Sequence, residues 1–212
     1  YFNSGDPNTN TLRMYEFTGG GVAVLDYDAN GWPDVYLTQG CRWPPAAGQK
    51  EHLDQLYRNS GTERFDNVTH AAGLGDDRFS HGASVGDIDQ DGFPDLFVAN
   101  IGANRLYRNN GDGTFSDVSA SAGVESDEWT TSALIADLNG DALPELYAVN
   151  YLTGEDVFER LCRSSDGVTG LCAPKTFAGE QDRLHLNLGD GHFRDVTHQC
   201  GVAVPAGMGL GV

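Results

Sequence analysis

The chain has 212 residues, with 31 aspartate and glutamate residues against 13 lysine and arginine residues and a formal net charge of −18. This balance argues against nucleic-acid binding, because phosphate contacts require clustered cationic side chains. No stretch approaches the roughly 18 consecutive apolar residues that a membrane-spanning helix needs. With 39% hydrophobic residues and 28 glycines, the chain can bury a core and is expected to form many tight turns.

Three similar units follow one another along the chain, and each joins an acidic segment to a segment with the pattern Leu-Tyr/His-x-Asn. The acidic segments open at Gly21, Gly82 and Ser132, and the spacing between them is unequal. We therefore expect loops of variable length between constant elements. The predicted bounds are 1–20 for an N-terminal segment, 21–74, 82–124 and 132–202 for the units, about 151–182 for an insertion in the third, and 207–212 for the start of a fourth.

Each unit is expected to form four short strands, because β-branched and aromatic runs alternate with Gly, Pro, Asn and Asp. No window shows a sustained helical period. Repeated four-stranded units are typical of β-propeller blades, whereas a β-sandwich has no reason to repeat one loop three times. The predicted fold class is an all-β propeller. Since a propeller typically needs about 4–8 blades, the chain is expected to be part of a longer protein or to be completed by another chain.

An acidic loop separates the first two predicted strands of each unit. Oxygen-bearing side chains occupy its positions 1, 3, 5 and 9, and position 7 is apolar and can offer only a backbone carbonyl. Ca²⁺ takes roughly 6–8 oxygen ligands, which such a loop and a water molecule can supply. The predicted ligands are Asp26, Asp28, Asn30, Trp32 and Asp34; Asp87, Asp89, Asp91, Phe93 and Asp95; and Asp137, Asn139, Asp141, Leu143 and Glu145.

Two other interpretations of these loops fit the sequence less well. An EF-hand loop ends in a bidentate glutamate at position 12, where this chain has Leu37, Val98 and Ala148. A turn held by its own Asp or Asn side chain would explain one such loop, but three in register favour a metal. The third loop departs most from the pattern, with an asparagine at position 3, an alanine at position 6 and a glutamate at position 9. It is predicted to be the weakest site.

Residues 104–118 read Asn-Arg-Leu-Tyr-Arg-Asn-Asn-Gly-Asp-Gly-Thr-Phe-Ser-Asp-Val and follow the acidic loop of the second unit. This combination resembles the FG-GAP/VCBS repeats of integrin α-subunit propellers, and more closely proteins of the ASPIC/UnbV and cartilage-acidic-protein type. The resemblance covers essentially the whole chain, from about residue 16 to residue 212. It implies a secreted or surface-exposed propeller with Ca²⁺ in its blade hairpins, and mostly adhesion, matrix or binding roles.

The four cysteines indicate an oxidising compartment, because their number is even and none forms a CxxC pair. Cys162 and Cys172 are close in sequence and are predicted to form a disulfide. A bond between Cys41 and Cys200 would follow only by elimination, and four free buried thiols are the alternative. Asn67 begins an Asn-Val-Thr sequence that could be glycosylated in a secreted protein.

The favoured function is a non-enzymatic, extracellular calcium-binding propeller that acts as an adhesion or ligand-binding module. About three Ca²⁺ ions are expected, with a protein or glycan as ligand, no nucleic acid and no membrane span. A second interpretation is a structural surface or filament protein that assembles from copies of itself through an exposed sheet edge. A third is a propeller appendage of a secreted enzyme. Ser84 lies in a Gly-x-Ser-x-Gly pattern, but it aligns with ordinary strand positions and is not expected to be a nucleophile.

Overall fold

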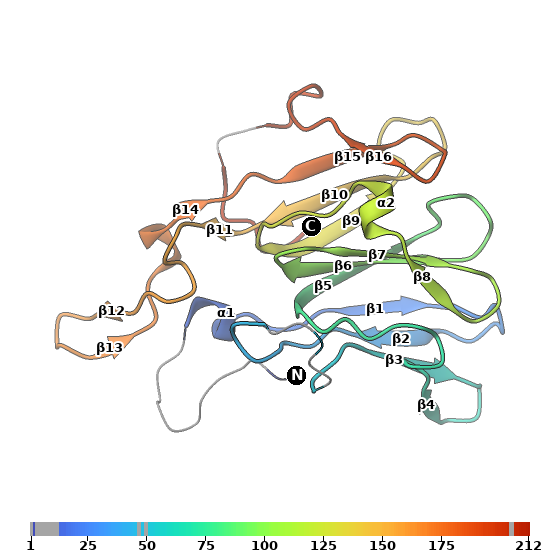
Figure 1. Cartoon of the computed structure of the whole chain (residues 1–212), viewed down its shortest axis with the longest axis horizontal. Coiled ribbons are helices and arrows are strands. Elements are labelled where there is room, and N and C mark those ends of the chain that lie inside the picture. The colour runs from blue at the N-terminus through green and yellow to red at the C-terminus, as the bar shows by residue number, and fades with distance from the viewer. Residues whose placement is uncertain (1, 3–12, 46–47, 49–50, 204–205) are drawn as a thin grey trace.

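Three four-stranded antiparallel sheets form most of the fold (Figure 1). The computed structural model describes residue 2 and residues 13–45, 48, 51–203 and 206–212, so much of the predicted segment 1–20 lies outside the described residues. The strands of the three sheets are β1 (Val22–Leu25), β2 (Asp34–Leu37), β3 (Gln55–Asn59) and β4 (Phe65–Asn67); β5 (Phe79–Gly86), β6 (Asp95–Ile101), β7 (Arg105–Asn109) and β8 (Phe115–Asp117); and β9 (Thr130–Ala136), β10 (Glu145–Asn150), β15 (Arg183–Asn187) and β16 (Phe193–Asp195).

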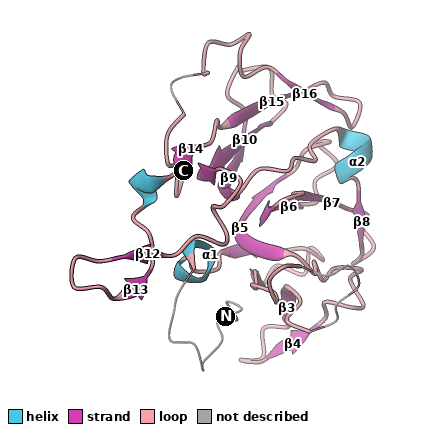
Figure 2. Cartoon of the chain, turned by 60° about the vertical axis from the view of Figure 1, so that its left-hand side comes forward, coloured by secondary structure: helices cyan, strands magenta, loops and turns pink. Residues whose placement is uncertain are grey.

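The order of strands in the sheets is β1-β2-β3-β4, β5-β6-β7-β8 and β9-β10-β15-β16. Each sheet is an antiparallel meander, and in the third an insertion separates β10 from β15. The first strands pack against one another, β1 on β5 and β5 on β9. Figure 2 shows the strands spread over the molecule, with only short helices beside them. Among the described residues these are α1 (Met14–Phe17), α2 (Ser119–Ala122) and a single 3-10 turn in the insertion of the third unit. Adjacent four-stranded meanders of this kind are propeller blades, and the predicted all-β propeller class is confirmed.

Two apolar clusters join the three blades. The first lies between the first two sheets and includes Leu25, Tyr36 and Leu96, and the second lies between the last two and includes Phe97 and Leu146. Each of these side chains is at most 5% exposed. Burial of a large apolar side chain contributes about 1.5–3 kcal/mol, so the alternating apolar positions of the strands hold neighbouring blades together.

Glycines next to or within the first strand of a blade let adjacent blades approach closely. A Cβ atom on Gly21 would lie 2.7 Å from the carbonyl oxygen of His81, and one on Gly82 would lie 2.7 Å from that of Thr131. Real Cβ contacts are essentially never this short. The glycines with which the first two acidic segments open are therefore required by the distance between backbones of successive blades.

The insertion in the third unit leaves the end of β10 and extends away from the sheets, on the left of Figure 1. It contains β11 (Leu152–Thr153), β12 (Cys162–Arg163), β13 (Thr169–Gly170), the 3-10 helix Pro174–Thr176 and β14 (Ala178–Gly179). A disulfide joins Cys162 to Cys172, with the two Cα atoms 4.9 Å apart. The predicted pairing of these two cysteines is confirmed.

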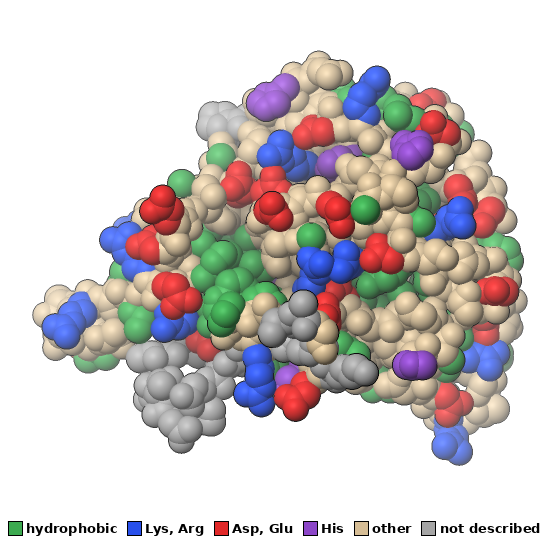
Figure 3. Space-filling model, viewed as in Figure 1, with side chains coloured by type: hydrophobic (Ala, Val, Ile, Leu, Met, Phe, Trp, Pro, Cys, Tyr) green, Lys and Arg blue, Asp and Glu red, His purple; other side chains and the backbone are tan. Residues whose placement is uncertain are grey.

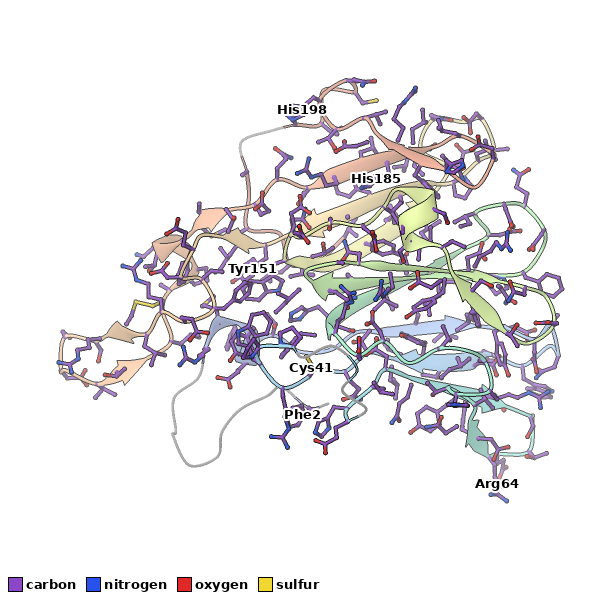
Figure 4. All side chains as sticks on the ribbon, in the orientation of Figure 1. Phe2, Cys41, Arg64, Tyr151, His185 and His198 are labelled. Carbon is purple, nitrogen blue, oxygen red and sulfur yellow. A yellow bond between two sulfur atoms is a disulfide. The ribbon has the colours of Figure 1, made fainter. Side chains whose placement is uncertain are left out.

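The bond between Cys41 and Cys200 that followed by elimination is wrong. Cys200 is an exposed free cysteine in the turn after β16. Cys41 is fully buried in an apolar cluster with Tyr15, Phe79 and Trp129. Figure 4 shows Cys41 and Tyr151 at the end of the sheets where α1 and the insertion lie. Cys41 follows β2 in the first blade, whereas Cys200 follows β16 in the third, so the two cysteines belong to different blades.

Residues 207–212 run beside the third sheet. Gly209 donates its N–H to the Asn150 carbonyl at 3.2 Å, and Ser80 donates to the Gln39 carbonyl at 2.9 Å in the same way. The segment thus meets the third sheet as β5 meets the first.

No helix among the described residues has the length and hydropathy to cross a membrane. Acidic and basic side chains are interspersed over the face shown in Figure 3.

Candidate metal centre

The three acidic loops lie at one end of the molecule, on the right of Figure 1, because each connects the first strand of a blade to the second. The carboxylate at position 1 organises each loop by accepting backbone N–H groups. Asp26 accepts from Asn30 at 3.0 Å and from Gly31 at 2.8 Å. Asp87 accepts from Asp91 at 3.1 Å and from Gly92 at 2.9 Å. These bonds curl each loop around its own carboxylates.

The carboxylate at position 9 is fully buried in the first two loops. Asp34 accepts the N–H of Tyr27 at 3.1 Å and that of Asn59 at 2.7 Å. Asp95 accepts the N–H of Ile88 at 2.8 Å and that of Asn109 at 2.8 Å. Each oxygen thus has one backbone donor and retains a lone pair, so both carboxylates are fixed in position and can still bind an ion.

Two clusters of three carboxylates result, and the ligand atoms within each lie within 4.8 Å of one another. The first is formed by Asp26, Asp28 and Asp34, and the second by Asp87, Asp89 and Asp95. Burial raises the pKa of Asp95 to about 7, and the charges of Asp89 and Asp91 add to the rise although two backbone donors oppose it. Burial likewise raises the pKa of Asp34. A cation between the carboxylates would relieve this repulsion.

The oxygens of the first cluster fit a metal ion. Asp28 Oδ1 is buried and has no hydrogen-bond partner among the residues that the structure describes. Its other oxygen, Oδ2, forms an ion pair with Arg58 Nε at 2.5 Å. The partner of Arg58 is therefore one of the predicted metal ligands. A bound ion would give the orphaned oxygen a partner and would compete with the guanidinium for Asp28.

The third loop is not one of these clusters. The Asn139 side-chain amide donates to Asp141 at 2.9 Å and to Glu145 at 3.1 Å. An amide group therefore bridges carboxylates that a cation would otherwise hold. Ala142 occupies position 6 with a φ of +75°, where Gly31 and Gly92 have +87° and +91°, a region that favours glycine. The structure thus supports two carboxylate clusters where the sequence predicted about three sites.

The apolar residue at position 7 packs on the opposing hairpin turn of its own blade. A Cβ on Gly61 would lie 2.4 Å from the Trp32 ring, one on Gly111 would lie 2.8 Å from Phe93, and one on Gly189 would lie 3.0 Å from Leu143. The glycine-containing turns between the third and fourth strands thus pack against the acidic loops. Metal binding by the backbone carbonyls of position 7 stays a prediction.

Sequence reasoning missed an asparagine at the end of the third strand of each blade. Asn109 Nδ2 donates to the Tyr27 carbonyl in the loop of the preceding blade at 2.9 Å. Asn187 Nδ2 donates to the Ile88 carbonyl at 2.8 Å, again in the preceding blade. The recurrence of this asparagine, which is Asn59 in the first unit, was the available signal. Its partner is 82 residues away for Asn109, so spacing alone could not identify it.

Asn67, the candidate glycosylation site, is exposed, and its side chain already has a structural role. Its Oδ1 accepts the backbone N–H of Thr69 at 3.1 Å and the Thr69 hydroxyl at 2.8 Å. Asp117 and Asp195 make the same pair of bonds in the other blades.

Ser84 lies within β5, and its hydroxyl accepts the N–H of Ile135 at 3.2 Å.

A hollow of about 310 Å³ lies among the inner strands, lined in part by Phe17, His81, Thr131 and Tyr151. His81 is only 4% exposed. Its Nδ1 lies 3.4 Å from the Gly19 carbonyl, while Nε2 has no hydrogen-bond partner in the described part of the chain. Burial lowers the pKa of His81 to about 4, so its ring is neutral at pH 7. This hollow combines aromatic surfaces with hydrogen-bonding groups.

The fold and the acidic loops together define a β-propeller whose hairpins can hold metal ions. A family model described as an FG-GAP-like repeat matches residues 26–98 and again residues 87–148. These matches span more than half of the chain, which therefore belongs to the FG-GAP-like repeat family. No curated protein matches it.

Among solved structures, one match is an Agrocybe aegerita lectin whose description gives specific recognition of non-reducing terminal N-acetylglucosamine. The identity is 16% and the TM-score is 0.40, and the match covers 82% of this chain and 36% of the lectin chain. The chain therefore spans about a third of the length of that structure.

Proposed function

We propose that the chain is an extracellular calcium-binding propeller of the ASPIC/UnbV type, whose blades present a ligand-binding surface. The observation that carries the proposal is the pair of carboxylate clusters, each with one fully buried aspartate and with ligand oxygens within 4.8 Å of one another. The surrounding donors are carboxylates, amides and backbone carbonyls, and neither loop contains histidine or cysteine. Such oxygen-only sets suit Ca²⁺, whereas zinc sites generally include nitrogen or sulfur.

Calcium would be held by Asp26, Asp28 and Asp34 in the first loop and by Asp87, Asp89 and Asp95 in the second. Bound calcium neutralises the carboxylates and fixes the hairpin that they close. The role is structural, since extracellular calcium modules bind at roughly 10⁻⁴–10⁻³ M. The disulfide in the insertion accords with an oxidising, extracellular location. No catalytic role is proposed for the chain.

The ligand surface that we propose includes the hollow beside His81 and Tyr151, which would take part of a protein or glycan. A self-assembling protein is the second candidate, and exposed apolar residues favour it. Val22 and Val24, on the outer side of β1, are 58% and 60% exposed. Light scattering separates the two: a monodisperse monomer in millimolar CaCl₂ would exclude self-assembly, and a glycan array screened in CaCl₂ and in EDTA tests ligand binding.

Thermal unfolding in EDTA and in millimolar CaCl₂ tests calcium binding. We expect the melting temperature to rise with calcium and to saturate, because an ion that binds only the folded chain stabilises it. Calorimetry should find two sites per chain, and Asp89→Asn should remove one. Asp112→Asn is the matched control, since Asp112 lies in the exposed turn of the same blade and outside the cluster. No calcium-dependent shift in a folded chain would contradict the proposal.

A further inference from the structure

We infer that Asn109 couples the first metal site to the second, so that an ion in one strengthens binding in the other. The inference deepens the proposed function and rests on it. Its basis is a series of hydrogen bonds from Asp34 in the first cluster to Asp95 in the second, which passes through the backbone of Tyr27 and through Asn109.

The series begins at Asp34, whose Oδ2 accepts the N–H of Tyr27 at 3.1 Å. The carbonyl of the same residue, Tyr27, accepts the side-chain Nδ2 of Asn109 at 2.9 Å, and both Tyr27 and Asn109 are buried there. The backbone N–H of Asn109 then donates to Asp95 Oδ1 at 2.8 Å. The Asn109 backbone thus donates to a predicted ligand of the second site, and its side chain donates to the loop of the first site.

The same connection is incomplete between the second and third blades. Asn187 Nδ2 donates to the Ile88 carbonyl at 2.8 Å, and Ile88 donates its N–H to Asp95. In the third loop, however, Glu145 accepts the N–H of Leu138 and the amide of Asn139. Gln90 provides a separate contact, since its Nε2 donates to the Ala142 carbonyl at 2.6 Å. The first two blades therefore provide the clearest link between two carboxylate clusters.

Coupling follows because both sites order the same residues. An ion that fixes Asp34 also fixes the backbone of Tyr27 through its N–H, and this orders the Tyr27 carbonyl that accepts the Asn109 side chain. An ion in the second site then binds to an Asp95 whose donor is already in place. By linkage, the effect on the first site equals the effect on the second. Buried hydrogen bonds transmit this order well, because their loss leaves polar groups without partners.

Terbium luminescence can read the first site alone. Trp32 lies in the first loop, whereas the second and third loops have Phe93 and Leu143 at that position. Trp43 and Trp129 belong to the aromatic group around Tyr15 and Phe79, away from the loops. Tb³⁺ prefers oxygen ligands, as Ca²⁺ does, and an indole sensitises its emission only when the ion is near. Tb³⁺ titration, with Ca²⁺ competition, therefore gives the affinity of the first site.

The experiment is a double-mutant cycle on the full chain with Asp89→Asn, which disables the second site, and Asn109→Ala, which removes the link. We expect Asp89→Asn to weaken the first site by roughly fivefold or more, within the usual range of coupling between sites. In the Asn109→Ala background, Asp89→Asn should leave the affinity of the first site unchanged. Circular dichroism checks that each variant folds.

Asn187→Ala is the matched control. It removes the equivalent turn bond, to the Gly189 N–H, and the equivalent bond to the preceding blade, at the Ile88 carbonyl. In its background, Asp89→Asn should still weaken the first site. If Asn109→Ala does not fold, Asn109→Asp replaces it, since aspartate retains an oxygen that accepts the Gly111 N–H and has no NH2 donor. The negative charge that it adds is present with and without Asp89→Asn, so the comparison within this background still isolates the link. An equal effect of Asp89→Asn with and without Asn109, or no effect at all, overturns the inference and leaves calcium binding intact. Failure of the unmodified chain to bind Tb³⁺ or Ca²⁺ overturns the proposed function and the inference together.

Discussion

The Arg58 guanidinium forms an ion pair with Asp28, one of the predicted ligands of the first metal site. Its Nε lies 2.5 Å from Asp28 Oδ2, and the Asp28 side chain is only 14% exposed. Arg108 holds the same position in the second unit with an exposed side chain, and Leu186 holds it in the third. The two carboxylate clusters therefore differ in the charge that an incoming ion must displace.

Arg58→Leu should tighten metal binding at the first site by a few-fold, because the ion no longer competes with a guanidinium for Asp28. Leucine is chosen because the third unit carries it at this position. Trp32-sensitised Tb³⁺ luminescence measures the effect. Arg108→Leu changes the net charge equally and should alter the first site far less. Equal tightening in both variants would show that overall charge, and not the ion pair with Asp28, sets the affinity.

At the scale of elements, a second repeated residue closes the end of each blade away from the acidic loops. It is Asp54 in the first unit, Asn104 in the second and Asp182 in the third, always two residues before the leucine of the third strand. Each accepts a backbone N–H from the end of the second strand or just beyond it, from Gln39 at 2.6 Å, Asn100 at 2.8 Å and Asn150 at 2.8 Å. These bonds fix the pairing of the second and third strands.

Asp54→Asn should stabilise the chain at alkaline pH by several degrees in melting temperature. Asp54 is fully buried, and burial followed by the charge of Asp76 raises its pKa well above the usual range. A raised pKa means that its contribution to stability is complete below about pH 4 and is lost as the pH rises through the folded-state value. The advantage of the Asp54→Asn variant over the wild type should therefore grow from pH 4 to pH 8.

Asparagine can keep the bond from the Gln39 N–H, because Asn104 accepts the equivalent N–H in the second blade. Its NH2 group can donate to the Tyr36 hydroxyl, which now donates to Asp54 Oδ2. Thermal unfolding of both proteins across this pH range measures the difference. Asp182→Asn, at a less buried position, is the control and should change stability little. A variant that is less stable than the wild type at pH 8 would show that the Asp54 charge itself supports the fold.

On the scale of the whole molecule, the insertion and the metal sites lie at opposite ends of the sheets (Figure 1). The insertion is anchored by its own disulfide and by an apolar group that includes Leu152, Val157 and Phe177. Acidic loops are instead supported by the turns of their own and neighbouring blades. The two ends therefore depend on separate contacts, although the two apolar clusters between the sheets join the blades.

Replacing both Cys162 and Cys172 with serine should expose the insertion to proteolysis and leave the calcium-dependent rise in melting temperature unchanged. The disulfide closes a short loop, with a sequence separation of 10, and such a bond mainly restricts the unfolded insertion. Limited proteolysis followed by mass spectrometry locates the cleavage. A reduced calcium-dependent shift in the double variant would contradict the independence of the two ends.

Much of the fold could be predicted because its signals are local. Strand alternation, turn residues and the spacing of the acidic loops all involve near neighbours in sequence, and so does the Cys162–Cys172 bond. The elimination argument for Cys41 and Cys200 failed because it used no spatial information. In the third loop, ligand spacing is kept, yet Asn139 bridges its neighbours, which a pattern of residue types does not reveal.

The sequence by itself determined the blade repeat, the family and the oxygen atoms available to a metal, since strand period and loop spacing depend on residues close along the chain. Only the tertiary structure decided which carboxylates gather, that Arg58 pairs with Asp28, and that Asn109 reaches Tyr27 across 82 residues. These contacts join separate strands or blades. Their distances are set by how the sheets pack, because apolar burial between blades fixes where each loop and turn meets its neighbour.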